Sequence, residues 1–452
     1  MVNKTKKLSK GKSIKKIKSK SIKKIKPKSI KKIKPKSKKS TESNTIIKEI
    51  DNTINITKNY KDNTKSSCIN LNNTSILCPK VERVYKKNIG IVVNENVVDD
   101  AKKYILKCCD GDDYSLYFTS GEIESNRIIL CCAVNAYRKI RKIKPHVIIS
   151  STEHCSITKY ANSLHDSGQI ELSIIKPNSY GCILSHTVAD IVKPNTCLVL
   201  ITYINQELGS VNNIEKISNI LHEKKVPLHS DCTYLFGKHK LNLKKTNIDS
   251  VTISFDIIGG PIGLGALIVS DKFLIGYKLD EHSTTLENKN PFNIPAIMAA
   301  TEAVKISMNN RKLKNDKMLK FRNDIITQMG SKFQTLTFAN FMKSDDPPLE
   351  DSTKPKNKLI ILGPPIDNNS YYTPSILSLV ILGSKKKTAS IIQNELKKKD
   401  IIIGIPDLSK NNIYDEIGMP EDAQSYIIRI SLSDNITQSD INKFITTIKG
   451  II

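Results

Sequence analysis

Residues that could bind a ligand lie where apolar runs of this 452-residue chain end. Asp231 directly follows the strand pattern 226–230, and such positions in parallel sheets face the ligand crevice. The segment Tyr117-Phe-Thr-Ser-Gly121 leads from a strand pattern into a helical one. The free amides of a helix N-terminus form a ready site for phosphate. The two segments therefore predict a crevice that offers a carboxylate and a phosphate site.

A glycine-rich run follows at 254–267, with the sequence Ser-Phe-Asp-Ile-Ile-Gly-Gly-Pro-Ile-Gly-Leu-Gly-Ala-Leu. One interpretation is a nucleotide-binding loop. The run lacks the lysine and the Ser/Thr of a P-loop, and its glycines do not follow the GxGxxG order. The sequence therefore argues against a nucleotide site here.

From about residue 95 the chain alternates between short apolar runs and amphipathic helical patterns. Ile214, Ile217 and Leu221, for example, recur at spacings of three and four, which places them on one helix face. Such alternation predicts a mostly parallel sheet that is covered by helices on both sides. The expected strands are 115–119, 147–151, 197–204, 226–230, 251–254 and 266–269.

The pattern changes after about residue 275 and predicts a second, smaller region. Its expected elements are helices at 294–308, 388–398 and 438–447, strands at 376–382 and 426–431, and a surface insertion at 343–358. The predicted organisation is a disordered lysine-rich repeat tail (1–45), a linker (46–90), a large α/β domain (91–275) and a small α+β domain (276–452).

The ordered motifs resemble those of the cysteine desulfurases, the NifS-like branch of the class V aminotransferases, over roughly residues 95–450. The glycine-rich run is similar to the family's Ser-Gly-His-Lys-x-x-Gly-Pro-x-Gly-x-Gly-Ala-Leu motif. Its lysine forms a Schiff base with pyridoxal phosphate (PLP), whereas position 257 carries isoleucine. The resemblance implies the PLP-dependent transferase (aspartate aminotransferase-like) fold, with a large, mostly parallel sheet domain, a small α+β domain and a homodimer.

The resemblance also implies residues that would contact cofactor and substrate. His154 stacks on the pyridine ring, Asn205 contacts the phenolic oxygen, and Asp231 pairs with the pyridine nitrogen. Ser254 completes the non-covalent cofactor contacts, and Arg429 clamps the substrate carboxylate. Two structural interpretations stay open. His154 is then an ordinary histidine at a strand end, and Arg429 belongs to an ion pair within the protein.

Several positions depart from the family's pattern. Ile123 replaces a phosphate-binding threonine, and Tyr234 replaces the glutamine that contacts the phenolic oxygen. Asp256 replaces a phosphate-binding histidine and would repel a phosphate, while Pro291 stands where another phosphate-binding threonine belongs. The Asp-x-Ala-Ala-Thr-Thr strand that opens such enzymes has no recognisable counterpart.

The sulfur chemistry of the family needs a loop cysteine as well as the lysine. All ten cysteines lie at or before Cys232, and the expected loop aligns with 404–409, which contains none. Another lysine could replace the missing amine. Lys238, Lys240, Lys244 and Lys245 lie between Asp231 and the glycine-rich run, but the flanking motifs keep position 257 as the Schiff-base site.

These observations favour a pseudoenzyme scaffold, a NifS-like protein that has lost desulfurase activity and binds PLP at most non-covalently. The alternative is an active PLP-dependent enzyme of altered chemistry that uses non-covalently bound PLP as a transient cosubstrate. The presence of Asp231 and Arg429 favours the alternative, and Ile257 and Asp256 oppose it.

The N-terminal segment 1–40 contains 19 lysines and no acidic residue, so it supplies +19 of the net charge of +27. An octapeptide repeats in it three times, at 13–20, 21–28 and 29–36. Such a segment is expected to be disordered and to bind nucleic acid or another polyanion without sequence preference. A nuclear-import signal, an anionic surface and a purely solvating tail are the alternatives.

The chain begins without an apolar signal-peptide core and has no apolar run of about 18 residues, which predicts an intracellular protein that does not span a membrane. Its abundant Asn, Ile and Lys suggest an AT-rich genome, such as that of a large DNA virus or a parasite. The expected location is then the host cytoplasm or nucleus, or the virion. The pairs Cys108-Cys109 and Cys131-Cys132 invite a zinc site, but buried helix faces explain them more simply, and no metal is expected.

Overall fold

The computed structural model describes residues 69–72, 77–89, 95–277, 293–343, 357–364, 372–383, 387–406, 408 and 412–452. The chain divides into two units, 1–66 and 67–452, and all described residues belong to the second. The predicted repeat tail lies outside the described residues. So does most of the predicted insertion at 343–358.

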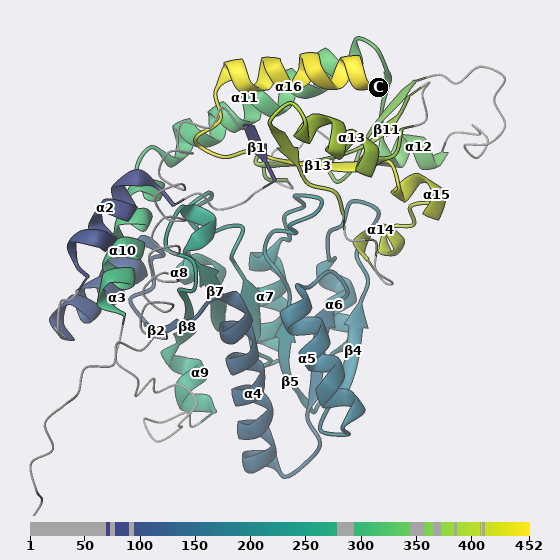
Figure 1. Ribbon diagram of the computed structural model, residues 1–452. Helices are drawn as coiled ribbons and strands as arrows, with labels where there is room; N and C mark the ends of the chain where they lie inside the picture. Colours follow the sequence, from purple (N-terminus) through teal and green to yellow (C-terminus); the bar gives the residue numbers. More distant parts are fainter. Residues whose placement is uncertain are drawn as a thin grey trace, which may run out of the picture. The chain divides into compact units, whose positions relative to one another are not determined.

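The first layer of the described unit is a seven-stranded sheet (Figure 1). All its neighbouring strands are parallel except at β8, which is antiparallel to both β2 and β7. This confirms the predicted large, mostly parallel sheet. In spatial order the strands are β2 (Tyr114–Thr119), β8 (Gly265–Ser270), β7 (Ser250–Ser254), β6 (Leu228–Asp231), β5 (Thr196–Leu200), β3 (His146–Ser150) and β4 (Glu171–Ile175).

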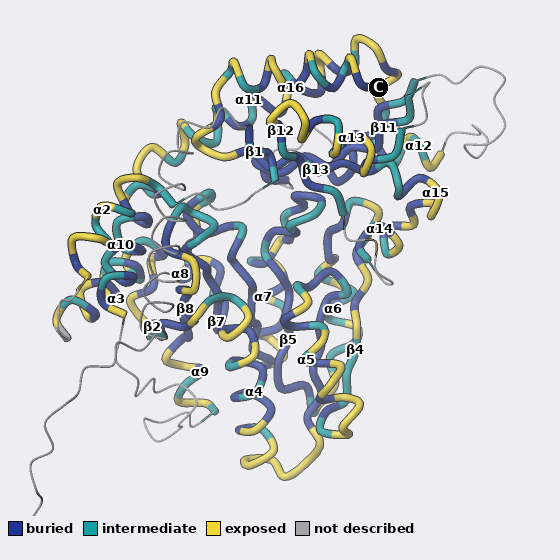
Figure 2. The backbone as a smooth tube through the Cα atoms, in the orientation of Figure 1, coloured by how far each residue is buried: buried dark blue, intermediate teal, exposed yellow. Residues whose placement is uncertain are grey.

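Helices cover both faces of this sheet, as the strand-helix alternation predicts. Successive residues of β3 point to opposite faces, so Val147 and Ile149 join one apolar cluster while Ile148 joins the other. Figure 2 shows the central strands as buried between these layers. On one face lie α4 (Glu122–Arg141), α5 (Cys155–Asp166) and α9 (Asp271–Gly276), and on the other α3 (Glu95–Cys108), α7 (Ile214–Glu223) and α10 (Ile294–Met308).

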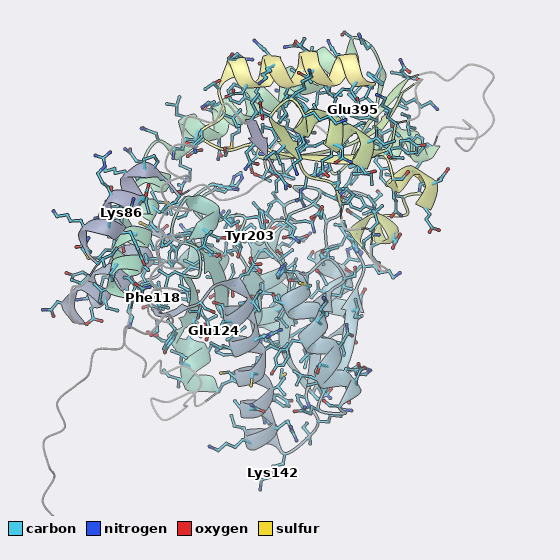
Figure 3. The ribbon with its side chains drawn as sticks, viewed as in Figure 1. Lys86, Phe118, Glu124, Lys142, Tyr203 and Glu395 are labelled. Carbon is cyan, nitrogen blue, oxygen red and sulfur yellow. The ribbon has the colours of Figure 1, made fainter. Side chains whose placement is uncertain are left out.

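Helix α4 carries charges that suit its direction. Its first turn contains Glu122 and Glu124, and its last turn contains Arg138, Lys139 and Arg141. Figure 3 shows Glu124 near one end of this helix and Lys142 at the other. Acids near the N-terminus and bases near the C-terminus are stabilised by the helix dipole. Local sequence thus helps to place the beginning of α4 at the edge of the sheet.

A second, four-stranded sheet follows in the chain. Its strands β13, β11 and β10 pair antiparallel, and β10 pairs with β9 in parallel. Helices α11, α13 and α16 contribute Phe321, Ile392 and Phe444 to its buried cluster. The bounds are β9 (Gln334–Thr337), β10 (Lys358–Ile361), β11 (Ile376–Leu382), β13 (Ile427–Ser431), α11 (Arg311–Gly330), α13 (Ala389–Lys397) and α16 (Gln438–Ile451).

The structure differs from the expected linker at 46–90, since this range contains two ordered elements. Strand β1 (Ile69–Leu71) pairs in parallel with β12 (Ile401–Ile403), which lies more than 300 residues away in the chain. Helix α2 (Pro79–Lys87) packs Val81 against α10. Both elements depend on distant partners, and a strand of three residues is too short to show a periodicity. Strand β1 therefore comes before the strands of the large sheet in the chain. Its sequence does not resemble the family's opening Asp-x-Ala-Ala-Thr-Thr strand.

The remaining described elements are short. They are α6 (Ser185–Ile191), α8 (Leu243–Thr246), the 3-10 turn η2 (Asp256–Ile258), α12 (Phe338–Lys343), α14 (Ile413–Glu416) and α15 (Glu421–Gln424). Among the helices that the structure describes, none combines the length and the apolar character that a bilayer crossing requires.

Candidate functional site

Five of the elements that sequence analysis placed around a ligand end at one edge of the large sheet. Asp231 is the last residue of β6, and Ser254 is the last residue of β7. Gly121 connects β2 to α4, while His154 caps α5 just beyond β3. Asn205 follows β5. Because the carboxyl ends of parallel strands meet at one edge, the fold brings these residues to a common crevice.

A buried polar network holds the Asp231 carboxylate. Asn126, which is fully buried on α4, donates from Nδ2 to Asp231 Oδ2 over 2.9 Å and to Ser156 Oγ over 3.0 Å. The backbone N–H of Thr233 donates to Asp231 Oδ1 over 2.9 Å. Sequence analysis gave Asn126 no role, although it follows the segment 117–121 by only five residues. Its signal was an asparagine in the first turns of a helix that packs on the sheet.

His229 contacts the other end of the Asn126 amide. Its Nε2 lies 3.1 Å from Asn126 Oδ1, and its Nδ1 lies 2.9 Å from Ser250 Oγ. Burial lowers the pKa of His229 to about 3, so the ring is neutral and donates a single N–H. The Asn126 amide is thereby fixed with its NH2 group toward Asp231, which keeps that carboxylate in place as an acceptor.

His154 is held by its own helix and by a carboxylate. Its Nδ1 accepts the backbone N–H of Ser156 over 3.3 Å, so Nε2 carries the ring proton. That nitrogen lies 3.2 Å from Glu122 Oε1. Burial is the main cause that lowers the pKa of His154. The ring is therefore a neutral donor to Glu122, a residue that sequence analysis did not single out.

Three carboxylates act on one another at this edge. The pKa of Glu122 is raised to about 8, first by burial and then by the charges of Asp231 and Asp256. Ser254 Oγ donates to Asp256 Oδ1 over 2.5 Å, and the N–H of Ile257 donates to the same oxygen over 3.0 Å. The crevice thus combines a histidine with an acidic cluster formed by Glu122, Asp231 and Asp256.

Asn205 and Arg429 belong to a second arrangement. Asn205 Oδ1 accepts the backbone N–H groups of Glu207 and Leu208, each over 2.9 Å, and thereby shapes its own turn. Arg429 Nη1 forms a salt bridge with Glu207 Oε1 from the same turn, and both side chains are about one-fifth exposed, at 18% and 20%. The structure therefore gives the predicted substrate clamp an internal carboxylate partner.

Three comparisons with known proteins bear on this geometry. Residues 92–284 match the family described as Aminotransferase class-V. The chain is 32% identical over 248 residues to the NifS of Bacillus subtilis and 32% identical over 180 residues to the cysteine desulfurase IscS of Plasmodium falciparum. The first match covers 52% of this chain and 61% of the relative, and the second covers 40% and 32%.

The chain is a NifS-like member of the class V aminotransferase family. Its matches span less than two thirds of these two relatives. In fold the protein is similar to a solved NifS-like protein, with a TM-score of 0.69, 18% identity and coverage of 85% of this chain and 99% of the other. The NifS-like protein of Rickettsia africae gives a TM-score of 0.66, 20% identity and the same coverages, 85% and 99%.

The family is PLP-dependent, so the residues of this NifS-like protein can be compared with what that cofactor needs. At the ring end the residue types fit, since the Asp231 carboxylate and the His154 ring both lie at the crevice. The phosphate end does not fit. The Ser254 hydroxyl is donated to Asp256, and the backbone N–H of Ser120 at the start of α4 is donated to Glu124 Oε2 over 2.6 Å. The carboxylate of Asp256 would repel a phosphate dianion.

The raised pKa of Glu122 predicts a pH-dependent stability. The folded protein holds a proton on this residue up to about pH 8, whereas the unfolded chain releases it near the ordinary glutamate value, so stability falls as the pH rises between these limits. Replacement of Glu122→Gln removes this cost. Relative to wild type, the variant gains about 1–3 kcal/mol of unfolding free energy between about pH 5 and pH 8, measured by urea unfolding.

The matched control is Glu223→Gln, the same change at an exposed position of α7. It leaves the pH dependence of the unfolding free energy as in wild type. An unchanged pH dependence in Glu122→Gln would show that Glu122 is ionised in the folded protein and is not part of the acidic cluster.

The salt bridge between Arg429 and Glu207 predicts a coupled effect on stability. Removal of either partner leaves a largely buried charge without compensation, so Glu207→Gln and Arg429→Met each destabilise the fold by about 2 kcal/mol or more. The double variant costs less than the sum, with a coupling energy of about 1–3 kcal/mol in a double-mutant cycle. The same cycle on the exposed pair of Lys193 and Glu171 gives no coupling. Additive effects at Arg429 and Glu207 would instead leave Arg429 available as a substrate clamp.

Proposed function

We propose that this NifS-like protein does not desulfurate cysteine and serves as a folded scaffold. Ile257 carries the proposal, because it occupies the position at which the resemblance requires the Schiff-base lysine. An aliphatic side chain can neither form an imine with a cofactor nor move a proton. The scaffold keeps the large sheet and the ring-end residues of the family.

The distribution of cysteine supports the same conclusion. The chain has no cysteine after Cys232, and that residue is fully buried at the end of β6. Burial raises the pKa of Cys232 well above the ordinary thiol value, which disfavours the thiolate that accepts sulfur. The aligned loop offers Gly404 and Ile405 in place of a thiol. Neither covalent partner of the family's reaction is therefore available.

An active enzyme of altered chemistry is the second candidate, with PLP bound non-covalently. The ordered network around Asp231 favours it, since Asn126 and Thr233 fix this carboxylate at the crevice. The charges at the phosphate end oppose it, and the Arg429 side chain already has a carboxylate partner. The scaffold proposal therefore agrees with more of the features of the crevice than an active enzyme does.

The two candidates differ in an assay of sulfide release. The full chain is incubated with PLP, cysteine and a thiol reductant, and sulfide is compared with protein-free mixtures. The scaffold proposal predicts release at the protein-free rate, because the amine and the thiolate are both missing. Asp231→Ala is the control for chemistry in this crevice. Catalytic release that saturates with cysteine and is abolished by Asp231→Ala would contradict the proposal and support the second candidate.

We further propose that the lysine-rich segment 1–40 attaches the scaffold to a polyanion, with nucleic acid as the partner. The support is its charge of +19, because neutralised phosphates release their counterions. The homodimer and the intracellular or virion location stay predictions.

Attachment through the tail predicts binding that salt weakens strongly. Fluorescence anisotropy with labelled duplex DNA is expected to show similar affinity for unrelated sequences. The logarithm of the binding constant should fall by about 0.9 per neutralised phosphate for each tenfold rise in salt. A chain without residues 1–40 should lose this binding. Equal affinity without the segment would show that the tail is only a solvating extension.

A further inference from the structure

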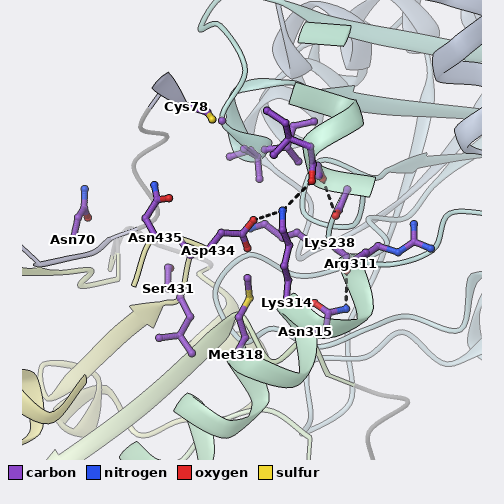
Figure 4. A pocket seen from close by; sticks show the side chains of 18 residues that line it. Asn70, Cys78, Lys238, Arg311, Lys314, Asn315, Met318, Ser431, Asp434 and Asn435 are labelled. Carbon is purple, nitrogen blue, oxygen red and sulfur yellow. Dashed lines mark hydrogen bonds and ion pairs between the residues drawn. The ribbon is translucent and has the colours of Figure 1, made fainter. Parts of the chain in front are cut away.

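A cavity of about 310 Å³ lies beside Ile257 and is separate from the crevice described above. Its wall includes Ile257 and Ile258 of η2, the beginning of α11, and the turn 431–435 that follows β13. His154, Asp231, Ser254 and Arg429 are absent from its lining. The lining combines apolar side chains, such as those of Ile257 and Met318, with the charged side chains of Lys314, Asp434 and Arg311 (Figure 4).

Lys238 is one of the residues that line this cavity. The turn after β6 is fixed by two hydrogen bonds to its backbone, from Asn315 Nδ2 to Lys238 O over 2.7 Å and from Ser307 Oγ to Gly237 O over 2.8 Å. Within the described residues the Lys238 ammonium has no hydrogen bond or salt bridge, and its one recorded contact is with the Tyr234 ring, at 5.6 Å from the centroid. The fold thus fixes the backbone of Lys238, and within the described residues no hydrogen bond or salt bridge engages its ammonium group.

Burial also changes the state of this amine. It lowers the pKa of Lys238 to about 8, against the opposing charges of Asp434 and Asp256. A lysine in water titrates near pH 10.4, so Lys238 holds far more neutral amine at neutral pH than an ordinary lysine does. A neutral amine is the nucleophilic form, and buried lysines of lowered pKa are those that form Schiff bases with carbonyl compounds.

The other charges around the cavity leave room for an anion. Lys314 Nζ and Asp434 Oδ2 are paired at 2.5 Å and neutralise each other, as the dashed line in Figure 4 marks. Arg311 donates from Nη1 only to the His239 carbonyl oxygen and to the sulfur of Met308, each over 3.4 Å. Among the described residues no carboxylate forms a salt bridge with Arg311 or Lys238. The cavity therefore has an excess of positive charge.

We propose that this cavity binds a small carbonyl compound with an anionic group, such as a 2-oxo acid, and that Lys238 captures it as an imine. Arg311 holds the anionic group. The nitrogen lone pair of Lys238 attacks the carbonyl carbon. The carbonyl oxygen then leaves as water together with the two hydrogens of the neutral amine, and a C=N bond remains. Imine formation needs no oxidant or reductant. Capture of a carbonyl compound goes beyond the proposed scaffold role and does not depend on it.

The site is tested by trapping on the full chain with glyoxylate, a small anionic aldehyde, and cyanoborohydride. Reduction converts an imine into a stable carboxymethyl-lysine, which peptide mass spectrometry locates. The expected result is that Lys238 is modified first, at a rate that saturates with glyoxylate, before the exposed lysines. Lys238→Arg keeps the charge and loses this fast phase. The matched control Lys244→Arg, at an exposed position in the same segment, leaves it intact.

Two further measurements separate capture from mere reactivity. Arg311→Gln should raise the glyoxylate concentration at half-saturation roughly tenfold, as the loss of about 1.4 kcal/mol of binding energy requires. The rate of Lys238 modification should level off as the pH rises past about 8, because this amine is then largely neutral.

The proposal is overturned if glyoxylate modifies Lys238 no faster than the exposed lysines, or if the rate does not saturate in a protein whose unfolding is unchanged. These outcomes are independent of sulfide release. A protein that fails to desulfurate cysteine can still trap glyoxylate, and a protein that desulfurates cysteine can fail to trap it.

Discussion

The buried hydrogen bond from Asn126 to Asp231 is the contact on which the rest of the site depends. It ties the first turns of α4 to the end of β6, and the neutral ring of His229 fixes the amide that makes it. The same amide also reaches Ser156, next to His154. Leaving a buried polar group of this network without its partner would cost folding free energy. The network therefore fixes the positions of α4, β6 and α5 relative to one another.

This arrangement of α4, β6 and α5 has an electrostatic consequence. It places Glu122 at the N-terminus of α4, where its carboxylate meets those of Asp231 and Asp256. The crevice therefore holds Asp231 and His154 next to the acidic side chains of Glu122 and Asp256. Ile257, at the position of the family's lysine, lines a separate cavity together with Lys238. The protein thus retains the frame of a PLP site with a different distribution of charge.

Sequence reasoning predicted the large sheet well because its buried strands are continuous apolar runs. The helix at 294–308 was predicted with the bounds that α10 has, since Pro295 lies in its first turn and buried residues recur along it from Ile294 to Ser307. It missed β4, where Ser173 and the exposed Ile174 interrupt the pattern, and β1, which depends on a distant partner. It also placed Asp231 at the crevice, because this residue ends a strand pattern, and His154, because of the family resemblance. It overlooked Glu122 and Asn126, which act only through residues far away in the chain.

The sequence by itself determined the class of the fold, the motifs of the family and the loss of the lysine and the cysteine, because each is written in local composition and order. Only the tertiary structure decided how the charges pair. Arg429 meets Glu207, and Glu122 meets His154, through contacts between segments that no local pattern relates. It also brought Lys238 and Arg311 to one cavity. The physical reason is that a pKa or an ion pair depends on burial and distance, and both exist only after the chain has folded.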